Sequence, residues 1–244
     1  MHLILDFGNT LIKCFVFDQQ SVVFKNTVNI DGWQQNGVQI LERFPAIEAV
    51  MISDVSGITK QNPPIFLREL PLYYCNSTLK LPFTNHYKTP KRLGADRIAL
   101  MAAGALLHPT EDLLVIDLGT CITYDFKDKN NNFFGGAIAP GFSMRYKSLH
   151  EKTGQLPDLE PKHPEHWIGN TTENAIHSGV YFGIISEIEG QIALYQKKYG
   201  DLTVILVGGD AERLSKPLKN SIFAHSNFLA IGLNYILELN KSEW

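Results

Sequence analysis

The sequence has few cysteines, no long apolar run and no strong excess of charge. Its three cysteines, Cys14, Cys75 and Cys121, are far apart and match neither a metal-ligand spacing nor a disulfide framework. Their neighbours are apolar or typical of strands, so we expect all three to be small buried hydrophobic residues. The sequence therefore predicts neither a disulfide-stabilised protein nor a cysteine-ligated metal centre.

The sequence also lacks the marks of a membrane or nucleic-acid protein. No uninterrupted apolar run approaches the ~18 residues of a membrane span, and strand-forming residues follow Met1 directly, which predicts no signal peptide. We therefore expect a cytoplasmic protein without a membrane partner. The net charge of -3 provides no field that attracts nucleic acid. A local basic cluster suits a small anionic ligand instead: Lys88, Lys91, Arg92 and Arg97.

Two similar glycine turns are the main pattern that is present. Residues 6–10 read D-F-G-N-T and follow the first apolar run, and residues 117–123 read D-L-G-T-C-I-T and follow a later one. In each copy a strand-like segment ends in an aspartate, and a glycine then turns the chain. Neither copy is a Walker A loop or a dinucleotide fingerprint, because G-x-x-x-x-G-K and G-x-G-x-x-G are absent there.

The predicted strands and helices around the two glycine turns also follow a repeated order. The residue patterns predict strands at 2–6, 11–17, 21–30, 47–53, 71–74, 113–117, 121–126, 133–139, 202–207 and 222–224. They predict helices at 33–44, after Pro63-Pro64, from Gly94 to about 107, after Pro140-Gly141, from Thr171 or Thr172 to about 199, and at 227–239. Residues 76–93 read as a long loop. The order β-β-β-α-β-α appears twice, which predicts an α/β fold with two domains, residues 1–109 and 110–244.

The glycine turns have a functional and a plain interpretation. Exposed backbone N–H groups at such a turn can hold a phosphate, and a neighbouring aspartate can hold a hydrated Mg²⁺. In the plain interpretation, Asp6 and Asp117 only form turns. Because both copies stand at equivalent places in a repeated unit, we favour the functional interpretation and expect a phosphate held between the two halves.

The segment Gly94-Ala95-Asp96-Arg97 opens a helix after the long loop. An aspartate in a first helical turn is ordinary, since the helix dipole favours it. In a functional interpretation, Asp96 is a general base for a substrate hydroxyl and Arg97 binds a substrate carboxylate. Charge alone leaves both interpretations open.

Other polar and glycine positions stay open as well. The pairs Gly135-Gly136 and Gly208-Gly209 could face a ligand or simply end elements, and Asp125 could have a catalytic or a structural role. The stretch from His163 to His166 contains Pro164 and has no third nearby ligand, so we expect a solvated loop there and no metal site.

Four ordered motifs resemble those of the type III pantothenate kinases: D-F-G-N-T, G-A-D-R, D-L-G-T-x-x-T and G-G-x-I-x-P-G. The resemblance extends from Asp6 to Gly209. It implies two ribonuclease-H-like domains of the actin-like ATPase fold, with mixed sheets flanked by helices and a ligand cleft between them. It also implies an ATP-dependent kinase that converts pantothenate to 4'-phosphopantothenate, the first step of coenzyme A synthesis, and a homodimer.

The resemblance also implies roles for individual residues. Asp96 matches the catalytic base, and Asp117 matches a ligand of a monovalent cation, K⁺ or NH₄⁺. Asp6 is expected to hold Mg²⁺ through water. The residues that match ATP contacts are Asp6, Phe7, Gly8, Asn9, Thr10, Leu11, Ile12, Lys13 and Thr120. The residues that match the pantothenate site are Tyr87, Gly94, Ala95, Asp96, Arg97 and Thr172.

Two alternatives from other classes accompany this interpretation. One is a non-catalytic nucleotide-binding regulator with the same fold, which the complete set of Asp6, Asp96, Arg97 and Asp117 disfavours. The other is a kinase that acts on a different small hydroxyl compound. A sugar has no carboxylate, so it would leave Arg97 without its expected partner.

Overall fold

The computed structural model describes residues 1–9, 11–214, 218, 222–223 and 226–241. The chain forms two compact units. The first contains residues 1–109, 131–133 and 227–244, and the second contains residues 110–130 and 134–226. Each unit has its own mixed sheet flanked by helices, which confirms the predicted α/β class.

The sheet of the first unit has the strand order β3-β2-β1-β4-β5. Strands β1 and β2 are antiparallel, as are β2 and β3, whereas β4 runs parallel to β1 and β5 runs parallel to β4. The strand bounds are β1 His2–Phe7, β2 Leu11–Asp18, β3 Ser21–Asn29, β4 Ala49–Asp54 and β5 Leu72–Tyr74. The helices of this unit are α1 Trp33–Arg43, α2 Ile58–Gln61, α3 Ala95–Leu107 and α7 Phe228–Asn240.

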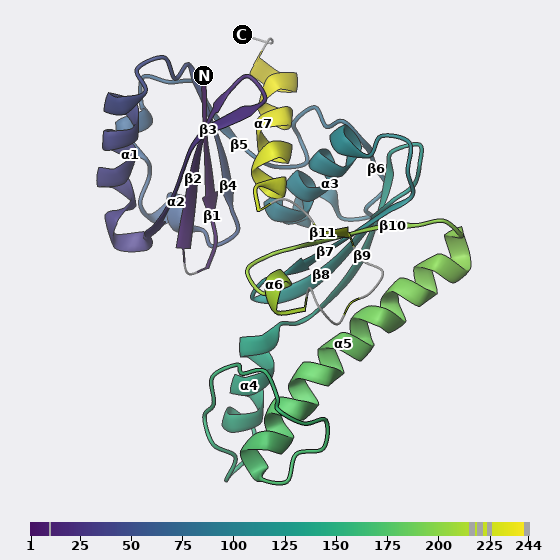
Figure 1. The fold of residues 1–244 in the computed structure, drawn as a ribbon. Helices are drawn as coiled ribbons and strands as arrows, with labels where there is room; N and C mark the ends of the chain where they lie inside the picture. The colour runs from purple at the N-terminus through teal and green to yellow at the C-terminus, as the bar shows by residue number, and fades with distance from the viewer. Residues whose placement is uncertain (10, 215–217, 219–221, 224–225, 242–244) are drawn as a thin grey trace. The chain divides into compact units, whose positions relative to one another are not determined.

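The second unit repeats the meander. Strands β7 and β8 are antiparallel, β9 follows beside β8, and β10 and then β11 continue the sheet in parallel on the other side of β7. The strand bounds are β7 Leu113–Leu118, β8 Cys121–Lys127, β9 Asn132–Pro140, β10 Thr203–Val207 and β11 Ile222–Phe223. The helices are α4 Phe142–Glu151, α5 Thr172–Tyr199 and α6 Ala211–Leu214, and α4 packs beside one end of the long α5 (Figure 1).

Most predicted elements are confirmed, and the differences are short segments. The expected loop at 76–93 contains the two-residue strand β6, Thr84–Asn85, which pairs with Asn132 and Phe133. It also contains the 3-10 turn Pro90–Arg92. The helix expected after Pro63-Pro64 is a single 3-10 turn, Ile65–Leu67, because three residues close only one such turn. The short helices α2 and α6 have too few residues to show a helical period.

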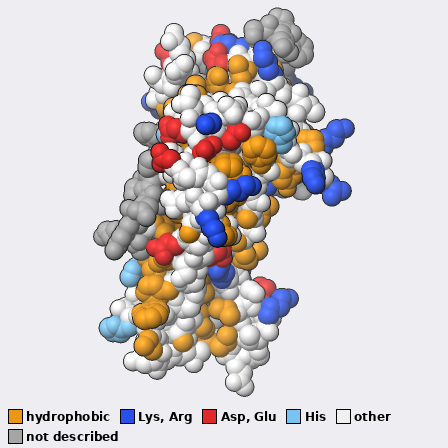
Figure 2. Space-filling model, turned by 90° about the vertical axis from the view of Figure 1, so that its right-hand side faces the viewer, with side chains coloured by type: hydrophobic (Ala, Val, Ile, Leu, Met, Phe, Trp, Pro, Cys, Tyr) orange, Lys and Arg blue, Asp and Glu red, His pale blue; other side chains and the backbone are white. Residues whose placement is uncertain are grey.

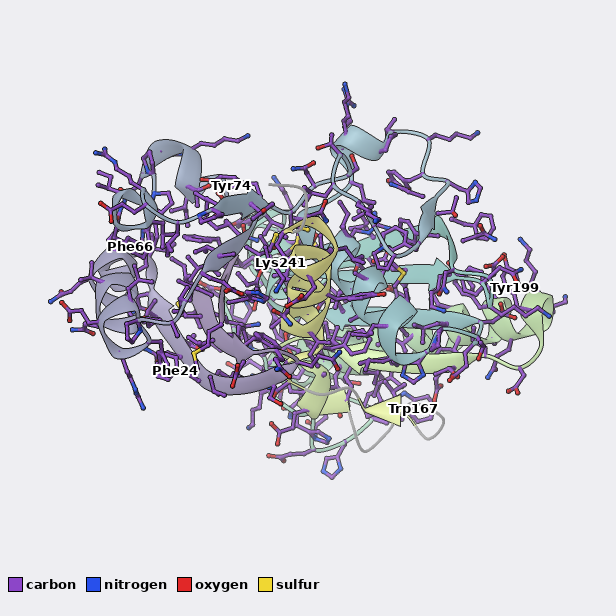
Figure 3. The ribbon with its side chains drawn as sticks, turned by 90° about the horizontal axis from the view of Figure 1, so that it is seen from above. Phe24, Phe66, Tyr74, Trp167, Tyr199 and Lys241 are labelled. Atoms are coloured by element: carbon purple, nitrogen blue, oxygen red, sulfur yellow. The ribbon has the colours of Figure 1, made fainter. Side chains whose placement is uncertain are left out.

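One face of the first sheet packs against α1 through aromatic side chains. The ring of Trp33 meets Phe7 edge-on with centroids 4.9 Å apart and meets Phe66 at 5.7 Å. Phe66 is labelled in Figure 3 beside α1. A Cβ at Gly37 would collide with the Phe66 ring, so the glycine gives the ring its present position against α1.

The other face of this sheet packs against α3 and α7 (Figure 1). Helix α3 is rich in alanine, and nine of its 13 residues, 97–105, are buried. A Cβ at Gly232 of α7 would collide with the carbonyl of Ala99, so the two helices touch backbone to backbone. The C-terminal helix thereby supports the helix that begins at Ala95, next to Asp96.

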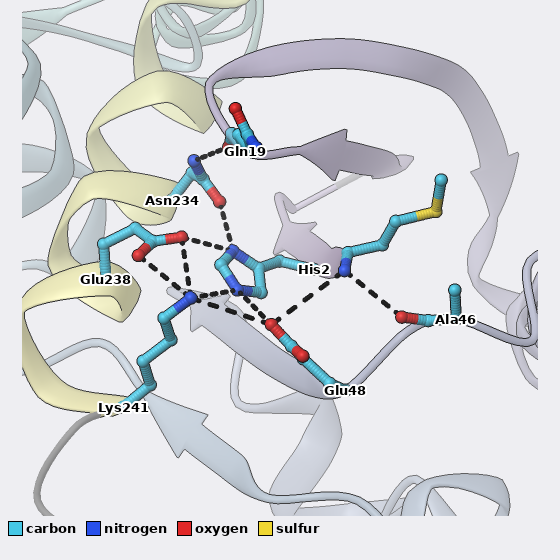
Figure 4. A network of polar contacts seen from close by, with 8 residues as sticks. His2, Gln19, Ala46, Glu48, Asn234, Glu238 and Lys241 are labelled. Atoms are coloured by element: carbon cyan, nitrogen blue, oxygen red, sulfur yellow. Dashed lines mark hydrogen bonds and ion pairs between the residues drawn. The ribbon is translucent and has the colours of Figure 1, made fainter.

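A buried histidine fastens α7 to the first strand (Figure 4). His2 Nδ1 lies 2.8 Å from Asn234 Oδ1, and Asn234 Nδ2 donates to the carbonyl of Gln19 over 2.9 Å. Around this buried pair, Lys241 lies 3.0 Å from Glu238 and 3.6 Å from Glu48, at the edge of the network. The Asn234 side chain therefore joins α7 to both β1 and the turn after β2.

Replacing Asn234 with alanine should destabilise the protein by about 1–3 kcal/mol, because it removes the buried hydrogen bond to His2 Nδ1 and the hydrogen bond to the Gln19 carbonyl. Lys241→Ala removes partly exposed ion pairs with Glu48 and Glu238 and a 3.2 Å contact with His2 Nε2, and it should lower the free energy of unfolding less than Asn234→Ala does. Urea unfolding of both variants measures the difference. Equal effects of the two substitutions would mean that the buried amide does not fasten the helix.

Candidate active site

The first cluster of candidate residues lies at the carboxyl end of the first sheet. In the strand register, Asp6 of β1 is paired with Lys13 of β2 on one side and with Ser53 of β4 on the other. The Asp6 side chain is only 8% exposed, and the Ser53 side chain is completely buried. Directly paired residues point to the same face of a sheet, so a cation and a hydroxyl flank the Asp6 carboxyl.

The start of α3 brings Asp96 to this cluster. Gly94 is the N-cap in an extended conformation, and Asp96 lies in the first turn, where Asp96 Oδ1 accepts a hydrogen bond of 2.8 Å from the backbone N–H of Arg97. A Cβ at residue 94 would collide with Asp96 Oδ1. The glycine of the G-A-D-R motif therefore leaves the space that the aspartate side chain occupies.

The electrostatics of the cluster are those of a buried carboxyl group, Asp6, near a partly buried one, Asp96. Burial raises the pKa of Asp6 to about 6, the nearby Lys13 and Ser53 lower it, and the Asp96 charge raises it. Burial also raises the pKa of Asp96, against the opposing effects of the Arg97 backbone N–H and guanidinium. An added cation beside these carboxyl groups would favour their charged forms.

Cys75 belongs to the same cluster. Its buried thiol lies 3.5 Å from the carbonyl oxygen of Ala95, and its backbone N–H donates to Ile52 over 2.7 Å. Burial raises the pKa of the Cys75 thiol, and the charges of Asp96 and Asp6 raise it further, so the thiol stays neutral. Cys14 is buried as expected, whereas Cys121 is only half-buried, because it starts β8 directly after the glycine turn.

Tyr87 and Arg97 pack together in the first unit. The Arg97 guanidinium carbon lies 5.5 Å from the centre of the Tyr87 ring, and that ring stacks on Phe133 at 6.3 Å. The Arg97 side chain is buried, which is rare for arginine unless it has partners. The structure therefore brings together Asp6, Lys13, Tyr87, Gly94, Ala95, Asp96 and Arg97 within one unit.

The glycine turn after β1 is described except for Thr10, which lies outside the described residues. Gly8 N–H donates to the carbonyl of Leu11 over 3.1 Å. In the turn after β7, Gly119 N–H donates to the carbonyl of Cys121 over 3.1 Å, which lies two residues ahead and not three. In both turns the glycine N–H donates to the first residue of the next strand, but the second turn is one residue shorter than the first.

The second turn is crowded by further glycine backbones. Gly208 has a positive φ of 98°, and a Cβ there would collide with Asp117 Oδ1 and the backbone of Leu118. Gly141 N–H donates to the carbonyl of Thr120 over 3.1 Å, and a Cβ at Gly141 would collide with that carbonyl. Gly208 therefore packs directly on the turn that carries Asp117. The sequence alone did not decide whether the Gly208-Gly209 pair has such a role.

The other open positions have different surroundings. A Cβ at Gly136 would collide with the carbonyl of Tyr124, so the Gly135-Gly136 pair lies inside β9 and allows close packing on β8. Asp125 is completely buried within β8. His163 and His166 are exposed, as expected for a solvated loop. Among the described residues, no group of three or more His, Cys, Asp or Glu side chains could hold a metal ion.

Thr172 lies in a groove of the second unit. It is the first residue of α5, after Thr171, whose side chain caps the helix by accepting from Asn174 N–H over 3.1 Å. The groove has a volume of about 810 Å³ and runs between α4 and α5. One of its walls is fixed by Arg145, which pairs with Glu187 over 2.6 Å. Residues that line this groove include Pro140, Met144, Arg145, Thr172 and Ile176.

No helix in the described part of the chain is long and apolar enough to cross a membrane.

The family model and the curated relatives that match this chain all describe the same family. A family model described as type III pantothenate kinase matches residues 2–194. A type III pantothenate kinase of Christiangramia forsetii is 44% identical over 243 residues and covers both chains completely. A second one, of Flavobacterium johnsoniae, is 44% identical over 234 residues and covers 96% of each chain.

Solved structures share the fold at low sequence identity. A structure described as a Baf family transcriptional activator from Campylobacter jejuni has a TM-score of 0.65 at 21% identity and covers 98% of this chain and 99% of its own. A glucokinase from an Antarctic psychrotroph has a TM-score of 0.53 at 13% identity and covers 97% and 98%. At these identities the likenesses concern the fold alone, and they confirm the predicted sugar-kinase, actin-like type.

Proposed function

The chain belongs to the type III pantothenate kinase family, and from this premise we propose how its own residues carry out the phosphorylation of pantothenate. The protein is a kinase that phosphorylates pantothenate in coenzyme A synthesis. The observation that carries the residue assignment is the cluster at the end of the first sheet. There the buried carboxyl group of Asp6 and the partly buried carboxyl group of Asp96 lie near one another beside the buried Arg97.

Asp96 is the proposed general base. It takes the proton of the primary hydroxyl of pantothenate while the hydroxyl oxygen forms a bond to the γ-phosphorus of ATP and the bond to the leaving ADP oxygen breaks. Its raised pKa supports this role, because a base works best when its pKa approaches the operating pH. Most of the rate enhancement comes from positioning and electrostatics, since phosphoryl transfer asks little covalent chemistry of the protein.

The residues around Asp96 are the proposed pantothenate contacts. Arg97 binds the substrate carboxylate, and the stacked Tyr87 ring holds the guanidinium in place. The backbone of Gly94 and Ala95 lines the approach to Asp96. Thr172 is proposed as a further substrate contact, supported by its place in the α4–α5 groove.

The first glycine turn is the proposed ATP phosphate site, with backbone groups from Asp6 to Ile12 and the ammonium of Lys13 toward the phosphates. Asp6 would hold the water shell of Mg²⁺. The fit is supported by the carboxyl groups of Asp6 and Asp96, which have Lys13 as a nearby cation on the side of Asp6, so that an added cation would favour their charged forms. When bound, Mg²⁺ neutralises charge on the phosphates.

The second glycine turn is the proposed site of a monovalent cation, K⁺ or NH₄⁺, with Asp117 as its ligand and Thr120 as an ATP contact. Carboxylate and carbonyl oxygens suit a hard cation. The fit is supported by the close packing of Gly208 against both Asp117 Oδ1 and the Leu118 carbonyl, which places two kinds of oxygen next to one another.

We also propose a cytoplasmic homodimer. The surface around α4 and α5 carries exposed apolar side chains, in the lower part of Figure 2. Trp167 and Ile168 are 76% and 79% exposed, and Ile138 and Leu194 are also more than half exposed. Patches of this kind mark protein interfaces, and most such assemblies are symmetric dimers. The cytoplasm is proposed because ATP is the phosphate donor.

A coupled assay of ADP release with ATP, Mg²⁺, K⁺ and pantothenate tests the proposed function. Turnover that depends on pantothenate is the expected result. Binding of Mg·ATP without turnover would instead support the non-catalytic nucleotide-binding regulator.

A further inference from the structure

The ring of Tyr87 lies between the Arg97 guanidinium and a second aromatic residue that is not among the proposed substrate contacts. That residue is Phe133, whose ring stacks on Tyr87 with centroids 6.3 Å apart and an angle of 19° between the ring planes. The guanidinium carbon of Arg97 lies 5.5 Å from the centre of the same Tyr87 ring. A chain of contacts therefore leads from Phe133 through Tyr87 to Arg97.

Phe133 is the fixed end of this chain of contacts. Its side chain is completely buried, and the ring of Phe83 meets it edge-on with centroids 5.7 Å apart. Its backbone is held as well, because it pairs with Asn85 in the register of β9 and β6 and its carbonyl accepts from His86 N–H over 2.9 Å. Although Phe133 belongs to β9, it is part of the first compact unit, as Tyr87 and Arg97 are.

Tyr87 is held less firmly than Phe133. It lies between the two-residue strand β6 and the 3-10 turn Pro90–Arg92, and its side chain is only half-buried. Its backbone N–H donates to Asn85 Oδ1 over 3.0 Å, which fixes the main chain but not the ring. A half-buried ring can adopt more than one rotamer, so its place beside the guanidinium depends on the surface that it packs against. Phe133 provides such a surface.

We propose that Phe133 is a positioning residue for the recognition of the substrate carboxylate. It holds the Tyr87 ring, and this ring holds the guanidinium of Arg97 in the orientation that the carboxylate requires. This inference rests on the proposed function, in which Arg97 binds the carboxylate of pantothenate. A guanidinium binds a carboxylate through a planar fork of N–H groups, so its orientation decides how well it binds. Phe133 therefore acts on the selection of the substrate and not on phosphoryl transfer.

A plain role in the core predicts a different behaviour. A buried phenylalanine that only fills space contributes to folding, so its replacement lowers stability and affects every substrate alike. A positioning role acts on one interaction, the one with the carboxylate. The measurement that separates the two roles is the carboxylate preference, defined as the ratio of kcat/KM for pantothenate to kcat/KM for its alcohol analogue.

The test compares variants at both ends of the Tyr87 contacts. Phe133→Leu keeps an apolar side chain but removes the flat ring, and it should lower the carboxylate preference about fivefold, the loss expected for a disturbed cation–π contact. The loss should come from a higher KM for pantothenate, with the KM for ATP unchanged. Phe133→Tyr keeps the ring and should keep the preference. Asn85→Ala, in a partly exposed position, removes the hydrogen bond to Tyr87 N–H and should lower the preference about threefold.

Phe17→Leu is the matched control, because Phe17 is an equally buried phenylalanine of the same unit, on β2. It should lower the Tm and keep the wild-type preference. An equal loss of preference in Phe17→Leu would overturn the inference, since the cause would then be a general loosening of the core. A wild-type enzyme without carboxylate preference would overturn the proposed role of Arg97. A wild-type preference that stays within twofold in both Phe133→Leu and Asn85→Ala would overturn the positioning role alone.

Discussion

Replacing Asp96 with asparagine should lower kcat on the order of a hundredfold or more, with the fold retained. Asparagine has the same shape and can still accept the backbone N–H of Arg97 that Asp96 Oδ1 accepts at 2.8 Å. It cannot take a proton from the substrate hydroxyl. Steady-state kinetics with saturating ATP and pantothenate measure the loss, and the KM for pantothenate should change much less than kcat.

Two comparisons sharpen the Asp96 result. Asp31→Asn removes an exposed carboxylate from the first turn of another helical segment and should leave kcat unchanged. The wild-type rate should rise with pH through the raised pKa of Asp96, above the ordinary value of an aspartate, because the base must be deprotonated. A kcat of Asp96→Asn within a few-fold of the wild type would remove Asp96 as the base.

Replacing Na⁺ with K⁺ or NH₄⁺ should raise the rate strongly if Asp117 holds a monovalent cation beside the phosphates. The carboxylate lies against the backbone of Gly208 and Leu118, where a cation of fixed size would find several oxygens. Asp117→Asn should remove this preference, since it removes the charge that attracts the ion. Rates in matched chloride salts of the three cations measure the effect.

The control for the cation prediction is Asp201→Asn, which removes an exposed carboxylate from the turn before β10. This variant should keep the full preference for K⁺ and NH₄⁺. Equal wild-type rates in all three salts would leave the Asp117 assignment without support.

The repeated meander and the glycine turns could be predicted because their signals are local. Alternating or continuous apolar runs of a few residues mark the strands, and Gly8 and Gly119 follow an aspartate in the same way in both units. The G-A-D-R segment could be located because Gly94 and Asp96 lie two residues apart, and their contact depends only on the start of one helix.

Contacts that depend on register or on helix packing could not be predicted. Ser53 reads as the end of an ordinary buried strand, and only the pairing of β4 with β1 places it beside Asp6. Cys75 reads as a plain core residue, and its place beneath Ala95 follows from the course of the chain after β5. Gly232 lies within a helix whose apolar pattern does not reveal that it packs on α3.

The central claim is that this chain transfers the γ-phosphate of ATP to pantothenate with Asp96 as the base and Arg97 on the substrate carboxylate. The most direct test measures ADP release with Mg·ATP and K⁺, using pantothenate or its alcohol analogue, which lacks the carboxylate. We predict efficient turnover of pantothenate and a kcat/KM for the alcohol at least tenfold lower, the loss expected for a charge-assisted hydrogen bond. Equal turnover of both compounds, or none of either, would contradict the account.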